Sequence, residues 1–267
     1  MLLRERIWLW GHPEGCFNNQ YGNSLPSRMT PMEFCSYMNI ANTFMVPMGH
    51  QVNRRQYNKS FTPLRSVGWE CFAAGANPEM IERNIEEAGQ FPNISSVVFD
   101  DFKSVDAEGL RYKRIPWENL MHIMDRVHNN DVRRLDAWMV LYTFQFGVSE
   151  EEDREFQPWM DAFDGIIMWT WEEKDVPLIP EKYEIFKRLT PHNRRMFGCY
   201  LYNFGESRQA TAQAVRWQLD FYREKILAGE AEGIVLHTNT MADLDYEAYD
   251  AALEWMREHG DEIVPDI

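Results

Sequence analysis

The chain has 267 residues, of which 45% are hydrophobic and 14% aromatic, and its formal net charge is −15. This length suits one α/β barrel domain spanning residues 1–267, since that fold typically takes about 250 residues. The negative charge argues against nucleic acid or an anionic membrane surface as a partner. No apolar run is long enough to cross a bilayer, so we expect a cytoplasmic protein, or an exported one if a leader has been removed.

Eight short apolar segments bounded by polar turns predict β-strands. They cover residues 6–12, 41–48, 66–72, 94–101, 134–143, 163–171, 195–203 and 231–237. Helical patterns lie between them, and three open with a capping residue followed by a proline or by acids: at Thr30, Asn77 and Ser149.

The remaining connections differ in how clearly they predict a helix. Residues 207–228 and 244–259 are long and periodic, and each pattern ends at a glycine, Gly229 or Gly260. Residues 50–65 read as a loop with one helical turn at most.

The order of these elements predicts a (β/α)8 TIM barrel. Buried parallel strands read as continuous apolar runs, as residues 97–99 and 139–141 do. The competing fold is a doubly wound open sheet, which usually binds a dinucleotide on a G-x-G-x-x-G turn after its first strand. Residues 11–15 lack that spacing, so the closed barrel is favoured and no organic cofactor is expected.

Two predicted strands end in paired carboxylates, which is the main indication of chemistry. Asp100 and Asp101 close the fourth strand, and Glu172 and Glu173 close the sixth. Because active sites of TIM barrels lie at the carboxyl ends of the strands, the two pairs are expected to face a shared cleft. Strand alternation would send one aspartate into the mouth and the other toward a neighbouring loop. Two close acids cannot both ionise cheaply, so one would keep its proton near neutrality and serve as a general acid.

Further polar and aromatic residues are predicted at the same rim. The candidates for substrate binding are Trp10, His12, His50, Glu70, Tyr142, Gln145, Trp171, Tyr202, Asn203, His237 and Asn239. Aromatic faces, amides and acids together are what a sugar needs for stacking and for hydroxyl hydrogen bonds. Trp8 and Trp169 share two Trp-x-Trp patterns with the rim tryptophans, but they suit the barrel core equally well.

Glu70 is unusual because its position predicts a carboxyl group within a strand. A buried acid needs a partner, which Arg65 or a neighbouring strand could supply.

Neither a metal nor a disulfide is expected. The four cysteines lie far apart and are predicted to be reduced thiols in the core. His12, His50 and His237 could converge with the aspartates, but no local metal-binding spacing supports this. No G-x-S-x-G elbow predicts a serine nucleophile either.

The Asp100-Asp101 pair ending the fourth strand, with Tyr202-Asn203 after the seventh, resembles glycoside-hydrolase TIM barrels that use substrate assistance. The resemblance implies that Asp100 polarises the N-acetyl group of the sugar and that Asp101 protonates the leaving oxygen. More broadly, the chain is similar to uncharacterised glycosidase-like TIM barrels of bacteria. It departs from better-known hydrolases in being short and in having no carboxylate at the end of the seventh strand, where many retaining enzymes keep their nucleophile.

The sequence therefore predicts a hydrolase acting on a small neutral or N-acetylated glycoside, with Asp101 as acid and Asp100, Glu172 or Glu173 as the second carboxylate. Two other classes remain open. One is a carbohydrate-binding barrel without turnover, and the other is a metal-assisted sugar isomerase or lyase. The sugar, its linkage and the oligomeric state are left open.

Overall fold

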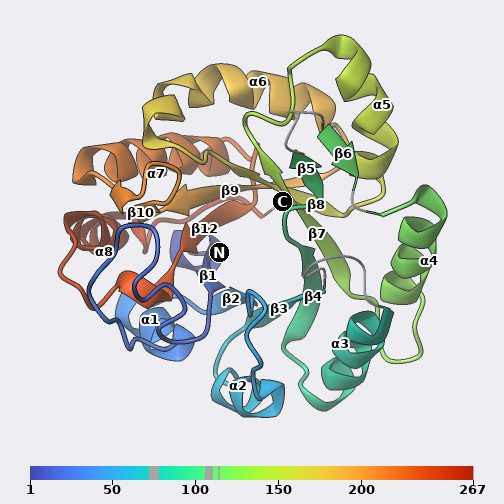
Figure 1. Cartoon of the computed structure of the whole chain (residues 1–267), viewed down its shortest axis with the longest axis horizontal. Coiled ribbons are helices and arrows are strands. Elements are labelled where there is room, and N and C mark those ends of the chain that lie inside the picture. Colours follow the sequence, from blue (N-terminus) through green and yellow to red (C-terminus); the bar gives the residue numbers. More distant parts are fainter. Residues whose placement is uncertain (72–77, 106–110, 114, 267) are drawn as a thin grey trace.

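The computed structural model describes residues 1–71, 78–105, 111–113 and 115–266. Its centre is a closed barrel of parallel strands in the order β1-β12-β9-β8-β7-β4-β3-β2 (Figure 1). The bounds are β1 Ile7–Gly11, β2 Asn42–Met45, β3 Ser66–Glu70, β4 Ile94–Phe99, β7 Asp136–Tyr142, β8 Gly165–Trp169, β9 Arg194–Tyr200 and β12 Gly233–His237. The predicted (β/α)8 barrel is confirmed, and each predicted strand segment overlaps one barrel strand.

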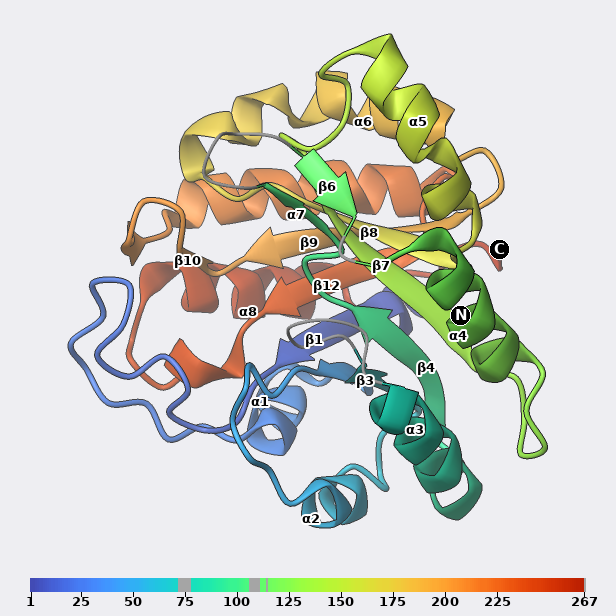
Figure 2. The ribbon, with the colours of Figure 1, turned by 45° about the vertical axis from the view of Figure 1, so that its right-hand side comes forward.

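Helices surround the barrel on its outside (Figures 1 and 2). Their bounds are α1 Pro31–Met38, α2 Arg54–Ser60, α3 Pro78–Gln90, α4 Trp117–His128, α5 Glu150–Asp161, α6 Ile179–Leu189, α7 Ala212–Leu227 and α8 Glu247–His259. Short 3-10 helices add η1 Leu3–Arg6, η2 Glu173–Leu178 and η3 Asn239–Met241. No helix among the described residues combines the length and the apolar character that a membrane span requires.

The predicted helix starts are confirmed where a side chain caps the helix. Thr30 accepts the backbone N–H of Glu33, and Ser149 accepts that of Glu152. Asn77 lies outside the described residues, and α3 begins at the following proline.

Three helix predictions need correction. The α7 helix begins at Ala212 rather than at 207, because Thr211 caps it and the preceding residues form the hairpin of β10 (Tyr202–Asn203) and β11 (Arg208–Gln209). The α8 helix begins at Glu247 rather than at 244. Residues 50–65, predicted as a loop with one helical turn, contain the seven residues of α2, because the Asn53 side chain accepts the backbone N–H of Gln56.

The helix-terminating glycines differ. Gly229 has the positive φ of a left-handed C-terminal residue, 71°. Gly260 is right-handed, and a Cβ there would lie 2.5 Å from the Met256 carbonyl oxygen, so close packing rather than a left-handed turn requires it.

Bulky aromatic side chains fill the inside of the barrel. Trp8, Phe44, Trp138 and Trp169 belong to the buried cluster enclosed by the strands. Space for them comes from strand glycines: a Cβ on Gly198 would fall 1.9 Å from the Trp169 ring. Since protein interiors are close-packed, such a glycine fixes where the large ring can lie.

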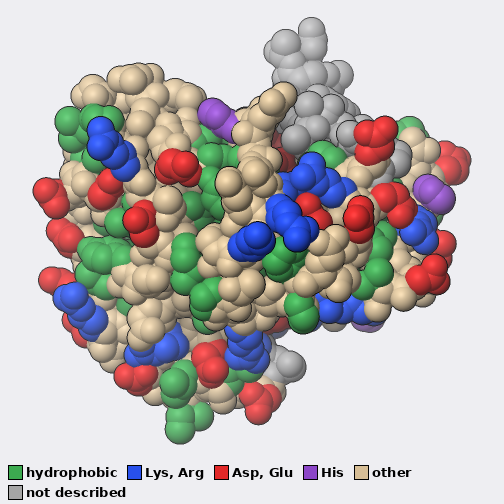
Figure 3. Space-filling view, turned by 90° about the horizontal axis from the view of Figure 1, so that it is seen from below, with side chains coloured by type: hydrophobic (Ala, Val, Ile, Leu, Met, Phe, Trp, Pro, Cys, Tyr) green, Lys and Arg blue, Asp and Glu red, His purple; other side chains and the backbone are tan. Residues whose placement is uncertain are grey.

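A second hairpin rises beside α5, formed by β5 (Lys103–Val105) and β6 (Arg111–Lys113) (Figure 2). Lys103 Nζ is 2.9 Å from the Glu152 carboxylate on α5, which ties the hairpin to that helix. The surface shown in Figure 3 carries interspersed acidic and basic side chains. All four cysteines are buried and unpaired, as predicted.

Candidate active site

A cavity of about 110 Å³ opens at the carboxyl ends of the strands. It is small beside the roughly 300–1,000 Å³ of drug-sized ligand pockets, so it suits only a small ligand group. The residues that line it come from most of the barrel strands and from the loops after β1 and β9: Trp10, His12, Phe17, Tyr21, Met48, Asp100, Asp101, Val140, Tyr142, Trp169, Trp171, Tyr200, Phe204 and His237.

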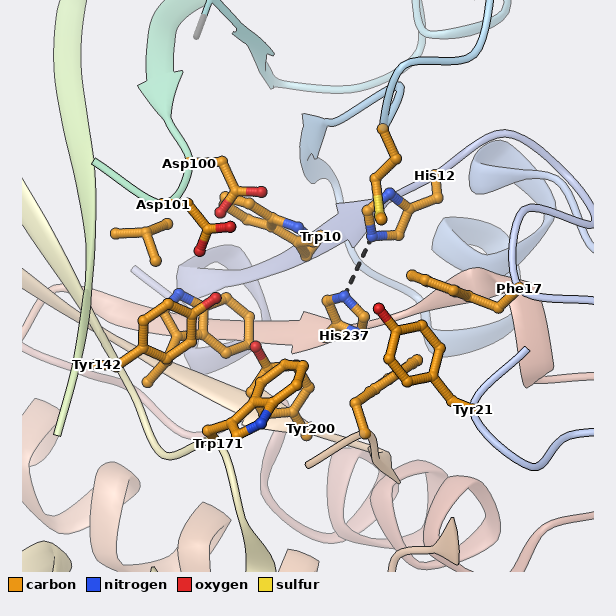
Figure 4. A pocket seen from close by; sticks show the side chains of 14 residues that line it. Trp10, His12, Phe17, Tyr21, Asp100, Asp101, Tyr142, Trp171, Tyr200 and His237 are labelled. Atoms are coloured by element: carbon orange, nitrogen blue, oxygen red, sulfur yellow. Dashed lines mark hydrogen bonds between the residues drawn. The ribbon is translucent and has the colours of Figure 1, made fainter. Parts of the chain in front are cut away.

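Both aspartates point into this cavity (Figure 4). The expectation that alternation separates them is wrong, because β4 ends at Phe99 and Asp101 has a left-handed φ of 48°. Aspartate is among the non-glycine residues that adopt this conformation most readily. The turn therefore brings two carboxyl groups to one side of the cavity.

Two tyrosine hydroxyls face the aspartates. Tyr142 ends β7 and Tyr200 ends β9, and both side chains line the cavity. Burial raises the pKa of both phenols well above the ordinary value, and the negative charges of Asp100 and Asp101 raise it further. Both phenols therefore stay protonated and can donate hydrogen bonds to a ligand.

Aromatic rings form the rest of the wall. Trp169 stands edge-on to Trp10 with ring centroids 5.5 Å apart, and it lies 4.8 Å from Tyr200. The Trp171 ring stands edge-on to Tyr200, with ring centroids 5.6 Å apart. It is stacked with Phe204, with ring centroids 6.5 Å apart. Such faces suit the C–H surface of a sugar.

A histidine pair closes the far side of the cavity. His12 Nδ1 is 2.7 Å from the Val46 carbonyl oxygen, to which it must donate, and its Nε2 is 3.1 Å from Nε2 of His237. Burial lowers the pKa of His12 to about 4 and that of His237 well below its ordinary value. Both rings are therefore neutral, and His237 donates its Nε2 proton to His12.

This geometry is relevant to the metal alternative. Both ring nitrogens of His12 are engaged, and the His50 side chain is exposed to solvent and does not line the cavity. Within the described part of the chain, no three His, Cys, Asp or Glu side chains converge as metal ligands would.

The Glu172 and Glu173 pair does not face the aspartates. Glu172 forms an ion pair with Lys174. Glu173 binds Arg208 at 3.1 Å and accepts the backbone N–H of Thr211, the residue that caps α7, at 2.8 Å. The expected cleft between two carboxylate pairs is thus not formed, because local cations and a helix terminus hold the glutamates outside the cavity.

Four other predicted rim residues support the site from behind. Asn239 accepts the backbone N–H of His12 and donates to its carbonyl oxygen. Gln145 accepts the backbone N–H of Tyr142 at 2.9 Å. The Tyr202 hydroxyl donates to the Tyr21 carbonyl oxygen at 2.7 Å, while the Asn203 side chain bonds Glu206.

Glu70 is the last residue of β3 and is 4% exposed. Of the two partners expected for it, Arg65 is wrong, since Arg65 pairs with Glu5 instead. Glu70 does not line the cavity. Burial raises its pKa to about 7, and the negative charge of Asp101 raises it as well, while Arg54 lowers it.

Sequence reasoning missed several lining residues: Phe17, Tyr21, Met48, Val140, Tyr200 and Phe204. Tyr200 could have been found, because it ends β9 as Tyr142 ends β7. Phe17 and Tyr21 come from the loop after β1, where no periodicity signals an inward side chain.

Fold and site together define a TIM barrel with an acidic, aromatic-lined cavity at the strand ends. No family model matches the chain, and no curated protein matches it in sequence. Solved structures are similar to it: active domain 2 of a thermostable chitinase from Pyrococcus furiosus has 10% sequence identity, 97% coverage of both chains and a TM-score of 0.60. A xylanase-A-amylase inhibitor protein has 9% identity, coverage of 97% and 99%, and a TM-score of 0.55. The tryptophan synthase α-subunit of Pyrococcus furiosus has 10% identity, 98% coverage of both chains and a TM-score of 0.50.

At such identities the likeness concerns the fold alone. The resemblance to glycoside-hydrolase-like TIM barrels is confirmed at that level. A chitinase domain and an inhibitor protein are both similar to this chain, so the barrel does not decide between turnover and binding, and function must be argued from the site.

Proposed function

We propose that the protein is a glycoside hydrolase whose acid is Asp101 and whose substrate carries an N-acetyl group. The observation that supports this most strongly is that Asp100 and Asp101 both line one small cavity together with aromatic rings. Among the described residues that line it, these two are the only carboxylates. With Glu172 and Glu173 held elsewhere, the cavity offers no second carboxylate across from the pair within the described part of the chain.

A substrate-assisted reaction needs only one such pair. The N-acetyl oxygen attacks the anomeric carbon as the bond from that carbon to the leaving oxygen breaks, and Asp101 gives its proton to that oxygen. Asp100 accepts a hydrogen bond from the N-acetyl nitrogen and stabilises the positive charge of the cyclic intermediate. Water then attacks the anomeric carbon, its proton returns to Asp101, and the ring opens to restore the N-acetyl group.

The protonated phenols suit the same substrate. Tyr142 and Tyr200 present hydroxyl donors beside the aspartates. Trp10, Trp169 and Trp171 provide apolar faces for the sugar ring. Because no cation lines the cavity among the described residues, a neutral sugar fits it better than an anionic one.

The test compares aryl glycosides that differ only at C2, with an N-acetyl group or a free hydroxyl. We expect cleavage of the N-acetylated substrate alone, release of the product with retained configuration, and inhibition by a thiazoline that mimics the cyclic intermediate. Equal cleavage of both substrates, or inversion of configuration, would contradict substrate assistance.

The second candidate is a carbohydrate-binding barrel without turnover. The aromatic rings that line the cavity would bind a sugar in this case as well. It is favoured if N-acetylated sugars bind without being cleaved. In that case Asp101→Asn changes affinity only.

A further inference from the structure

The cavity has walls on most of its sides. Its lining comes from β1, β2, β4, β7, β8, β9 and β12 or from the loops that follow these strands. The pair of His12 and His237 closes its far side. A sugar chain that binds through its middle needs a groove open at two opposite ends. A small cavity with walls around it instead takes a ligand end first.

Tyr21 forms the outer layer of one of these walls. Its ring lies beside Phe17 and Phe204, with ring centroids 5.7 and 5.2 Å away. Those two rings are each 3% exposed, whereas Tyr21 is 36% exposed. Part of the Tyr21 side chain therefore faces the cavity and part faces solvent. Figure 4 shows Tyr21 on the side of the cavity away from Asp100 and Asp101.

The backbone around Tyr21 is fixed against the hairpin of β10 and β11. The Tyr202 hydroxyl donates to the Tyr21 carbonyl oxygen at 2.7 Å. Tyr21 and Gly22 both have positive φ, 49° and 77°, and a Cβ on Gly22 would lie 2.5 Å from the Ser207 carbonyl oxygen. A left-handed tyrosine is uncommon, and the close approach at the next residue requires glycine. The loop is therefore shaped to bring the Tyr21 ring to this place.

The rest of this loop is fastened to the segment that follows β12. Asn239 donates to the Met29 carbonyl oxygen at 2.8 Å. The Asp243 carboxylate accepts the Ser27 hydroxyl and, at 2.9 Å, the backbone N–H of the next residue. With hydrogen bonds along its length, the loop is a fixed wall, and a ligand meets the cavity with this wall in place.

We infer that Tyr21 is a specificity-determining residue that closes the cavity sideways and restricts the protein to the terminal unit of a sugar chain. This inference rests on the proposed function and deepens it. The sugar unit in the cavity carries the anomeric carbon C1 beside Asp101, so it is the non-reducing end, and the leaving part of the chain lies outside. C4 lies across the pyranose ring from C1 and so faces the Tyr21 side. A further unit at C4 would collide with Tyr21, so the protein releases single sugars from the chain end.

Binding of two probes tests this inference without turnover. One is a short β-1,4-linked N-acetylglucosamine oligosaccharide, and the other is the same chain with a benzyl ether on its terminal 4-hydroxyl. In the Asp101→Asn background we expect the uncapped chain to bind about tenfold or more tightly than the capped one, because a steric clash rejects the cap. Adding Tyr21→Ala should reduce this ratio to about threefold or less.

Two further variants separate the ring of Tyr21 from other effects. Tyr21→Phe keeps the ring and should keep the full preference for the uncapped chain. Tyr37→Ala is the matched control, because Tyr37 is 38% exposed on α1 and does not line the cavity. The wild type needs no substitution for a second readout: it should release only the monosaccharide from the uncapped chain and leave the capped chain intact.

Equal binding of the two chains in Asp101→Asn, or early release of internal fragments by the wild type, would overturn the inference while hydrolysis itself stands. If the wild type binds the chains without cleaving them, the hydrolase proposal fails. In that case the preference for the uncapped chain, and its loss in Tyr21→Ala, still decides whether Tyr21 selects the chain end.

Discussion

The two acid pairs of this barrel have the same sequence signature and opposite surroundings. Asp100-Asp101 and Glu172-Glu173 each come after a buried apolar strand. The aspartates line the cavity, whereas the glutamates are bound by Lys174, Arg208 and the N-terminus of α7.

The difference lies in the path of the chain beyond each strand. After β4 a left-handed residue turns the chain and points both carboxyl groups inward. After β8 the chain enters η2, and nearby cations satisfy both glutamates. In this barrel, the direction that the chain takes after the strand decides whether the acids line the cavity.

Exchanging the acids for neutral isosteres gives the largest expected contrast. Removing a general acid typically lowers turnover by about 10²–10⁴-fold, so Asp101→Asn should lose that much kcat. Glu172→Gln should stay within about twofold of wild type, because Glu172 binds Lys174 outside the cavity. Initial rates on an aryl N-acetylhexosaminide measure both, with thermal melting as the control for folding. Similar losses of kcat in the two variants would contradict the different roles of the aspartate and glutamate pairs.

The second prediction concerns how the stability of the protein depends on pH through Glu70. Because the pKa of Glu70 is raised from 4.5 to about 7, the folded state keeps a proton that the unfolded state has lost. The contribution of Glu70 to the free energy of unfolding is fully present below pH 4.5 and is lost as the pH rises through 7. It amounts to about 3 kcal/mol. Urea unfolding of wild type and Glu70→Gln between pH 5 and 8 measures this. Parallel curves for the two proteins would contradict the raised pKa.

The glutamate pair should matter for stability rather than turnover. Glu173→Ala removes the hydrogen bond to the Thr211 N–H at the start of α7, and losing such a hydrogen bond costs about 1 kcal/mol. Glu172→Ala is the control, since its partner Lys174 is 64% exposed and such a surface pair contributes little. Denaturant midpoints should separate the two variants while their kcat values stay at the wild-type level.

The smallest effect is expected at the aromatic wall. Trp171→Ala removes one stacking face, worth about 1 kcal/mol, so KM should rise roughly fivefold with little change in kcat. Trp217→Ala is the matched control, because that tryptophan is exposed on α7 and does not line the cavity. Equal KM values for the two variants would argue against stacking on Trp171.

The barrel was predictable because its strands are continuous apolar runs, a local property that periodicity reveals. The site was predictable where a residue lies at or beside the carboxyl end of a strand and lines the cavity, as Trp10, Asp100, Tyr142 and His237 do. The other parts of the site depend on backbone geometry that the sequence pattern does not show. The left-handed turn at Asp101 and the loop that carries Tyr21 have no periodic pattern in the sequence.

Polar residues near the rim were the least predictable. Asn239, Gln145 and Tyr202 satisfy backbone groups behind the cavity instead of facing it. Their residue types suit both roles, and only the fold decides which atoms lie within reach.

The most direct test of the central claim is hydrolysis of an aryl N-acetylhexosaminide by the wild-type protein and by Asp101→Asn, with binding of the same sugar measured in parallel. We expect cleavage by the wild type, a loss of about 10²–10⁴-fold in the variant, and retained binding in both. Cleavage that persists in Asp101→Asn, or binding without cleavage in the wild type, would contradict the assignment of Asp101 as the acid of a glycoside hydrolase.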